Sequence, residues 1–287
     1  MKIAVVGLGL IGGSIARTIK KNTRHNCYAI ETNSHTVSLA LEQEAVDGII
    51  SPDELCEMDV VFVSLYVDSI IKFILDNLNN FKKGAIVADT CGIKSEVVSA
   101  VEAPLAQAGV NFVGCHPMAG REFSGFEYSV DNLFDNASCI LTPTEKTSPQ
   151  ALESFKKLIH EMRFRRIVES TPENHDRVIA FTSQLAHIVS SAYVKSPSLL
   201  KQDGFSAGSF KDMTRVAFLN EDMWTNLFML NRKPLLEEID SIILALSDYR
   251  DVLETQDSQK LHELLKQGRE LKEKSNELIK NSSESSK

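Results

Sequence analysis

A glycine-rich turn near the N-terminus constrains the fold of this 287-residue chain more than any other feature. The turn follows an apolar, β-branched run at residues 2–6 and opens a segment with helical spacing at residues 11–21. In such a turn the first glycine permits the tight bend, the second lets a pyrophosphate approach the backbone, and the third lets the helix pack on the sheet. The turn therefore predicts a dinucleotide site, with an unliganded glycine turn as the alternative. Its residues are Gly7, Leu8, Gly9, Leu10, Ile11 and Gly12.

An acidic residue stands where a dinucleotide site needs one. Glu31 follows Gly12 by about 20 residues and ends a second strand-like run at residues 27–30. A carboxylate there can accept hydrogen bonds from both ribose hydroxyls and repels a 2′-phosphate, which favours NAD over NADP. The alternative is a solvated surface acid.

The first half of the chain alternates strand-like and helix-like segments. Short β-branched runs alternate with segments of helical spacing, and Ser34 is the expected N-cap of one helix. This alternation predicts an α/β fold of the Rossmann type, a doubly wound parallel sheet with helices on both faces. The predicted strands are 2–6, 27–30, 59–65, 85–88, 111–115, 138–141 and 165–168, and the predicted helices are 11–21, 34–44, 94–108 and 149–162.

The pattern changes at Thr171. Thr171-Pro172-Glu173 is typical of a helix start, and only helical signals follow as far as about residue 280. We expect a nucleotide-binding domain at 1–170, an all-α domain at 171–280 and a polar tail at 281–287. Residues 176–194 are nearly all apolar or small, so this helix is expected to be buried on most faces. A leucine row at residues 261–278 fits either a helix docked on its own domain or one packed on a second subunit.

Composition excludes several classes of protein. Lys and Arg total 31 against 39 Asp and Glu, and the net charge of −8 argues against general binding to nucleic acid or anionic membranes. The five cysteines form no paired motif, so we expect no metal site and a reduced, cytoplasmic setting. No apolar run is long enough to span a membrane. An anionic substrate would need a locally basic pocket.

Two polar motifs follow strands of the predicted sheet, where open parallel sheets bind ligands. Asp89, a candidate cofactor contact, begins the first, Asp-Thr-Cys-Gly-Ile-Lys, which ends at Lys94. His116-Pro117 begins the second, and the proline favours an extended backbone that holds the imidazole at the strand tip. Histidine is the side chain best suited to exchange a proton near neutral pH. The alternatives are a core histidine at 116, a loop acid at 89 and a surface lysine at 94.

The helical half carries two further groups of polar residues. One stripe of an apolar helix carries three polar residues, Asp176, Ser183 and His187, and is a candidate part of the site. The alternative is a buried stripe of hydrogen-bonded residues with a structural role only. Lys211 and Arg215 lie four residues apart, so an anion between them would relieve their repulsion. The Arg fork matches a carboxylate, and the alternative is a solvated face.

Five stretches together carry a resemblance to a known family. They are GLGLIGGS (7–14), DTCGIK (89–94), HPMAGREFSGFEYS (116–129), HDRVIAFTSQLAH (175–187) and FKDMTRVAFLNEDMW (210–224). In order and spacing they resemble prephenate dehydrogenases over about residues 1–280. The resemblance implies a dimer formed through the helical domain, a site in the cleft between the domains, and NAD-dependent oxidative decarboxylation of prephenate, a dicarboxylate, to 4-hydroxyphenylpyruvate in tyrosine biosynthesis.

The resemblance also implies residue roles. His116 would accept the proton of the ring hydroxyl, Ser183 would support that histidine, and Arg215 would bind a substrate carboxylate. The remaining implied substrate contacts are His187, Lys211, Glu122 and Trp224. Asp212 also matches a site-lining position of the family.

The sequence departs from the family pattern at several positions. Gly92 stands where many relatives carry a serine, and Arg121 replaces a common threonine. Many relatives read Ser-His-Leu-Pro-His where this chain has Gln184 and Ala186 in place of the histidine and the proline. Arg121 adds a cation beside His116 that can bind a carboxylate. These departures leave arogenate open as the substrate, and a nucleotide-sensing protein without catalysis is the more distant alternative. Because the chain ends after the helical half, we expect no regulatory ACT domain.

Overall fold

The computed structural model describes residues 1–121 and 123–284, with side chains as far as residue 280. The chain divides into two compact units, Met1–Arg232 and Lys233–Lys287. Our division at residue 170 remains a prediction, because the first unit combines the α/β half with the helices that follow it.

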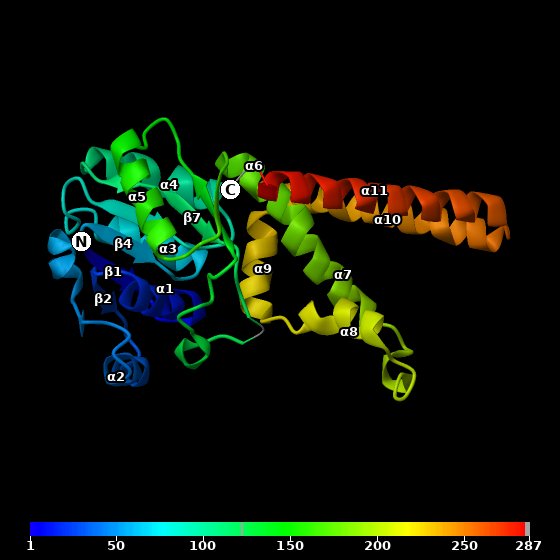
Figure 1. Ribbon diagram of the computed structural model, residues 1–287, viewed down its shortest axis with the longest axis horizontal. Coiled ribbons are helices and arrows are strands. Elements are labelled where there is room, and N and C mark those ends of the chain that lie inside the picture. The colour runs from blue at the N-terminus through cyan, green and yellow to red at the C-terminus, as the bar shows by residue number, and fades with distance from the viewer. Residues whose placement is uncertain (122, 285–287) are drawn as a thin grey trace. The chain divides into compact units, whose positions relative to one another are not determined.

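The first unit is built on a six-stranded, all-parallel sheet with the strand order β3-β2-β1-β4-β5-β6. The central strands are continuous apolar runs because helices cover both faces of the sheet (Figure 1). The parallel α/β fold predicted from the sequence is therefore confirmed. The strands are β1 (Lys2–Val6), β2 (Asn26–Ile30), β3 (Gly48–Ile49), β4 (Val60–Val63), β5 (Ile86–Asp89) and β6 (Asn111–Phe112).

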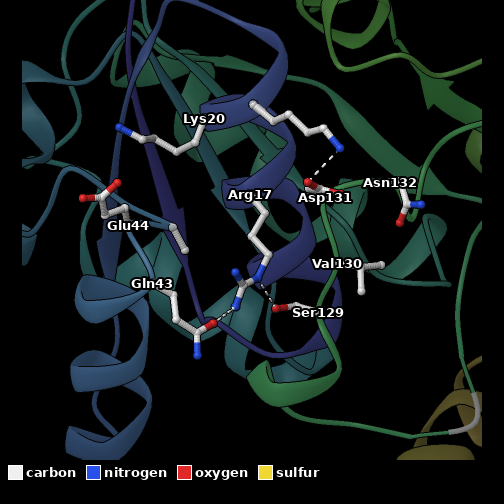
Figure 2. Close-up of a pocket in the computed structure, with 10 residues that line it drawn as sticks. Arg17, Lys20, Gln43, Glu44, Ser129, Val130, Asp131 and Asn132 are labelled. Atoms are coloured by element: carbon white, nitrogen blue, oxygen red, sulfur yellow. Dashed lines mark hydrogen bonds and ion pairs between the residues drawn. The ribbon is translucent and has the colours of Figure 1, made fainter.

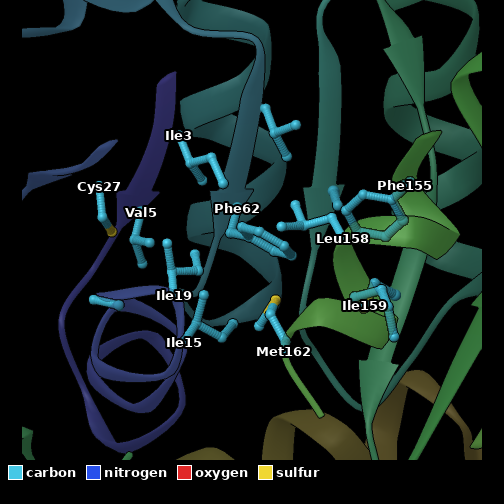
Figure 3. Close-up of a cluster of buried hydrophobic side chains, with 14 of the residues drawn as sticks. Ile3, Val5, Ile15, Ile19, Cys27, Phe62, Phe155, Leu158, Ile159 and Met162 are labelled. Atoms are coloured by element: carbon cyan, nitrogen blue, oxygen red, sulfur yellow. The ribbon is translucent and has the colours of Figure 1, made fainter. Parts of the chain in front are cut away.

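Alternate residues of the central strands point to opposite faces of the sheet and belong to two separate hydrophobic cores. On one face Ile3, Val5 and Phe62 pack against α1 and α5, where Ile15 and Phe155 are fully buried (Figure 3). On the other face the intervening strand residues pack against α3 and α4. The helices are α1 (Leu10–Asn22), α2 (Ser34–Glu42), α3 (Val67–Asp76), α4 (Ser95–Gln107) and α5 (Pro149–Glu161).

A second, three-stranded sheet has the order β7-β8-β9, with β7 antiparallel to β8. The single strand predicted at 111–115 is wrong, since β6 ends at Phe112 and β7 begins at Gly114. His116 consequently pairs with Ile140 inside β7, and the prediction that it stands at the tip of a parallel strand is also wrong. The strands are β7 (Gly114–Pro117), β8 (Ser138–Thr142) and β9 (Arg166–Glu169).

Helices follow from Pro172 onward, as predicted. The Thr171 hydroxyl accepts a hydrogen bond from the Asn174 N–H at 3.2 Å, which confirms it as an N-cap. The expected burial of residues 176–194 is wrong for the single chain, because Phe181 is 59% exposed and Tyr193 is 48% exposed. The elements are α6 (Pro172–Ile179), the π-helical η3 (Ala180–Leu185), α7 (Ala186–Tyr193), η4 (Leu199–Lys201), α8 (Gly208–Thr214), η5 (Arg215–Ala217) and α9 (Glu221–Leu230).

The second unit consists of two long helices, α10 (Arg232–Glu254) and α11 (Ser258–Glu284). They run antiparallel (Figure 1), and Gly268 of α11 lies beside the hydroxyl of Tyr249 on α10. Leu271 and Leu278 of α11 are more than 60% exposed, so α10 does not cover them.

Three local features differ from the sequence-based prediction. The N-cap of α2 is Asn33 and not Ser34, because the Asn33 side chain accepts hydrogen bonds from the N–H groups of His35 and Thr36. The short strand β3 and the helix α3 were not predicted.

None of the helices in the described part of the chain has the length and apolar character of a membrane-spanning segment.

Candidate active site

The glycine turn joins β1 to α1 in a shape that larger residues would block. Gly7 has a φ of +85°, in the left-handed region that favours glycine. A Cβ on Gly12 would lie 1.9 Å from the Gly7 carbonyl oxygen, so only glycine fits there. Gly9 caps α1, and a Cβ placed on it would meet no atom within 4 Å. The turn thus leaves open space at the N-terminus of a 13-residue helix.

The side chains of the turn differ in what they offer a ligand. Leu8 is buried, so only its backbone faces the turn, whereas Leu10 and Ile11 are partly exposed. Glu31 accepts hydrogen bonds from the Leu8, Thr32 and Asn33 N–H groups, each at 2.8 Å. These bonds hold a negative charge next to the glycine turn at the end of β2.

A buried ion pair lies beneath the loop after β5. The side chains of Lys94 and Asp89 are both 0% exposed, and the ammonium group also donates to the Cys115 carbonyl at 2.8 Å. Burial lowers the pKa of Lys94, but Asp89, together with Cys91 and Cys115, outweighs it and the net pKa is raised. The interpretation of Lys94 as a surface lysine is therefore wrong. Asp89 has no exposed side-chain surface, so its carboxylate supports the loop and is not accessible to a cofactor.

His116 ends a chain of three hydrogen-bonded side chains. Its Nδ1 lies 2.8 Å from His175 Nε2, and His175 Nδ1 lies 2.7 Å from an Asp176 carboxylate oxygen. The opposite edge of the His116 ring faces Gly92, where an added Cβ would lie 3.8 Å from Nε2. Burial, with smaller contributions from His175 and Lys94, lowers the pKa of His116 well below its ordinary value. The ring is therefore neutral, and it can accept a proton at neutral pH.

Asp176 ties the first helical turn of α6 to the start of α4. Its carboxylate accepts from the backbone N–H groups of Lys94 at 2.8 Å and Ser95 at 2.9 Å. Burial raises the pKa of Asp176, but the hydrogen bonds from His175, Ser95 and Lys94 outweigh it, and the net pKa is lowered. The Asn231 amide donates to the Asp176 carbonyl and to Gln184 Oε1. Asp176 is thus a buried, ionised anchor, which agrees with the alternative of a buried polar stripe for this residue.

A second group of predicted residues gathers along η3 and α7. Ser183 lies in the π-helical segment, a feature that is frequent at functional sites. Its carbonyl lies 2.8 Å from His187 Nδ1, and the His187 ring stacks on Trp224 with centroids 4.0 Å apart. Burial lowers the pKa of His187, the hydrogen bond to Ser183 opposes this, and the nearby Arg215 lowers it further. Arg215 therefore lies within electrostatic reach of this group.

The remaining predicted residues lie on exposed segments. Lys211 lies in the last turn of α8, one helical turn before Arg215, and both side chains are exposed. Arg121 donates from Nη1 to the Tyr128 carbonyl at 3.1 Å. Glu122 lies outside the described residues. Within the described chain, no cluster of three or more His, Cys, Asp or Glu side chains is arranged to hold a metal ion.

An open pocket of about 530 Å³ lies on the outer side of α1 (Figure 2). Arg17 donates to the Ser129 hydroxyl and the Gln43 amide oxygen, and Lys21 pairs with Asp131. Lys20, also in this pocket, pairs with an aspartate. These side chains tie α1 to its neighbouring loops, and the pocket contains none of the predicted site residues.

Family models match two successive segments of the chain. Residues 15–168 match the nucleotide-binding domain of prephenate dehydrogenase, and residues 171–267 match its dimerization domain. The chain belongs to the prephenate dehydrogenase family.

Relatives of this family span nearly the whole chain. Prephenate dehydrogenase of Bacillus subtilis is 31% identical, over 94% of this chain and 75% of that protein. A structure of prephenate dehydrogenase from A. aeolicus with hydroxyphenyl propionate and NAD+ has a TM-score of 0.85 at 28% identity, covering 97% of this chain and 98% of that one. A Synechocystis arogenate dehydrogenase structure has a TM-score of 0.80, also at 28% identity, covering 96% and 100%. Identity therefore does not separate the two substrates.

Two features of the site were missed by reasoning from the sequence. His175 contacts His116 directly, and Lys94 is buried with Asp89. The available signal for His175 was a His-Asp pair in the first turn of a helix that begins with a strong N-cap. In the structure His175 contacts His116 of β7, and Asp176 contacts the start of α4.

Proposed function

We propose that this protein catalyses the NAD-dependent oxidative decarboxylation of prephenate to 4-hydroxyphenylpyruvate, a reaction of tyrosine biosynthesis. Membership of the prephenate dehydrogenase family supports the reaction class. The observation that carries the proposal is His116, a neutral imidazole with one nitrogen bound to His175 and the other facing the loop after β5. A histidine in this state is suited to take the proton of the substrate hydroxyl.

The glycine turn and Glu31 fit NAD. Open space at Gly9 and the free N–H groups of the α1 N-terminus suit the pyrophosphate. Glu31 suits the adenosine ribose hydroxyls, and its charge disfavours the 2′-phosphate of NADP. When bound, NAD accepts hydride from the ring carbon that carries the hydroxyl. The other residues of the turn would contribute backbone groups and shape; they are Gly7, Leu8, Leu10, Ile11 and Gly12. Asp89 would act indirectly, because it holds Lys94 in place beneath the loop after β5.

The polar residues of the helical half would hold the substrate. Arg215 presents a guanidinium that matches a carboxylate, and Lys211 adds a second cation one turn away. These two residues supply the local positive charge that an acidic protein needs for a dicarboxylate. Ser183 would support His116, and the other predicted contacts are Arg121, Glu122, His187 and Trp224.

We further propose that the protein acts as a homodimer formed through its helical domain. The family model that matches residues 171–267 describes a dimerization domain. The uncovered leucines of α11, such as Leu271, suit an interface with a second copy. Sedimentation or light scattering would test this, and a monomer at assay concentration would contradict it.

The decisive test follows NADH absorbance with prephenate, with arogenate and without either compound. Turnover with prephenate alone supports the proposal, and turnover with arogenate alone would reassign the protein to arogenate dehydrogenation. NAD binding without turnover on either compound would favour a nucleotide sensor. Repeating the assay with NADP tests the role of Glu31.

Arg215→Ala is expected to raise the KM for prephenate about 10- to 100-fold. The reason is that a hydrogen-bonded contact to a charged group, worth about 1.5–3 kcal/mol, is lost from the ground-state complex. Steady-state kinetics at saturating NAD would measure it. Arg24→Ala removes an exposed arginine of the nucleotide-binding half and serves as the matched control. An unchanged KM in the Arg215 variant would remove this residue from substrate binding.

The pH profile of kcat/KM is expected to stay level below the ordinary histidine pKa of about 6.5. Because burial lowers the pKa of His116, the proton-accepting form persists as the pH falls and is lost only at the lowered pKa. Initial rates from about pH 8 to about pH 5 in overlapping buffers would locate this acid limb. An acid limb centred at or above about pH 6.5 would contradict the assignment of His116 as the base.

A further inference from the structure

His175 and Asp176 take no part in the proton and hydride transfers of the proposed reaction, yet they are among the buried polar residues of the first unit. His175 is 2% exposed and Asp176 is 5% exposed. The His116 and His175 rings meet edge to face, with centroids 5.1 Å apart and an interplanar angle of 63°. The arrangement is therefore a fixed contact between β7 and α6.

The direction of each hydrogen bond follows from the carboxylate. An ionised Asp176 can only accept, so His175 Nδ1 carries the proton of that bond. A neutral His175 then has a bare Nε2, which must accept from His116 Nδ1. His116 is left with its lone pair on Nε2, the nitrogen that faces Gly92.

The alternative protonation would disable the site. A doubly protonated His175 would donate from Nε2, which would force His116 Nδ1 to accept and place the His116 proton on Nε2. Burial lowers the pKa of His175 and outweighs the opposing hydrogen bond to Asp176, so His175 is neutral. The backbone N–H groups of Lys94 and Ser95 keep the carboxylate ionised and in place.

We propose that Asp176 and His175 are positioning residues that hold His116 in the tautomer with Nε2 free and with its ring directed at the substrate hydroxyl. This inference rests on the proposed function, because it assigns the two residues to the base of that reaction. When Nε2 takes the substrate proton, His116 keeps its Nδ1 proton and becomes an imidazolium. The ionised Asp176, two hydrogen bonds away, then stabilises the positive charge.

Two variants of His175 separate positioning from packing. Gln reaches the place of Nε2 with an amide oxygen and can still accept from His116 Nδ1, whereas Phe keeps ring volume and accepts nothing. We expect His175→Phe to lower kcat about 100-fold, with the KM for prephenate and the Kd for NAD within about twofold of wild type. His175→Gln is expected to retain kcat within about tenfold. His160→Gln, a change at an exposed histidine of α5, controls for loss of any imidazole.

Nitrogen NMR of protein labelled with 15N-histidine tests the tautomer without turnover. The chain has seven histidines, and the His116 signals are those absent from His116→Asn. Wild type is expected to show Nδ1 protonated and Nε2 bare, His175→Gln the same, and His175→Phe a mixture. A wild-type His116 protonated on Nε2, an unmixed tautomer in His175→Phe or kcat within about twofold of wild type in that variant would overturn the proposal.

The NMR result also keeps the two proposals separable. If His175→Phe fails to fold, the wild-type tautomer and its retention in His175→Gln decide the question. If neither prephenate nor arogenate is oxidised, the proposed function fails. The tautomer measurement still decides whether His175 orients His116.

Discussion

His116→Asn is expected to lower kcat by about 10²- to 10⁴-fold, the range that general-base catalysis contributes. The asparagine amide can still donate to His175, but it offers no nitrogen lone pair to the substrate hydroxyl. The glycine turn and Glu31 are untouched, so the Kd for NAD should be unchanged. Single-turnover absorbance of NADH would measure the chemical step directly, and fluorescence titration would give the Kd.

The matched control is His160→Asn, which removes an exposed imidazole of α5 that is not among the site residues. It should leave kcat and the unfolding midpoint at wild-type values. Turnover of His116→Asn within about tenfold of wild type would show that another group, or water, takes the proton.

Lys94→Met is expected to lower the free energy of unfolding by about 3–5 kcal/mol, because it leaves the Asp89 carboxylate buried and unpaired. The ammonium group also holds the Cys115 carbonyl directly before His116, so kcat should fall as well. Urea unfolding followed by circular dichroism would measure the change in stability.

An exposed pair on α3 provides the comparison. Lys72 pairs with Asp76 one turn away, both side chains are more than half exposed, and Lys72→Met should cost less than about 1 kcal/mol. Adding Asp89→Asn to Lys94→Met removes the uncompensated charge and should recover part of the lost stability. Equal effects of Lys94→Met and Lys72→Met would show that the buried pair contributes no more than a surface pair.

The α/β core was predictable from the sequence because its signals are local. β-Branched runs and the Thr171 cap coincide with elements in the structure. The division between β6 and β7 was not predictable, since residues 111–115 read as one buried run and periodicity does not show where a chain changes sheet. Helix α3 begins at Val67, and its N-cap residue Tyr66 makes no side-chain cap, so the usual start signal is absent.

The site was predictable where a residue's own chemistry suggests its role. His116, Arg215 and the glycine turn stand out by residue type and spacing, and their roles remain to be tested. Lys94 and His175 depend on tertiary partners. Lys94 is buried only because Asp89 meets it inside the fold, and His175 reaches His116 only because α6 begins beside β7. His116 and His175 are far apart in the sequence, so no short window contains the pair. Lys94 and Asp89 stand in one motif, but the Cys115 carbonyl that Lys94 also binds comes from a distant segment.

The bond between Asp176 and the first N–H groups of α4 also constrains how the first unit can move. If the helical half swung away at this point, Asp176 would lose two backbone donors and His116 would lose its partner. The start of α6 is therefore held to β7 and to the start of α4 by these three hydrogen bonds. A movement of the helical half that keeps these bonds must therefore begin beyond Asp176, in the segments that follow the start of α6.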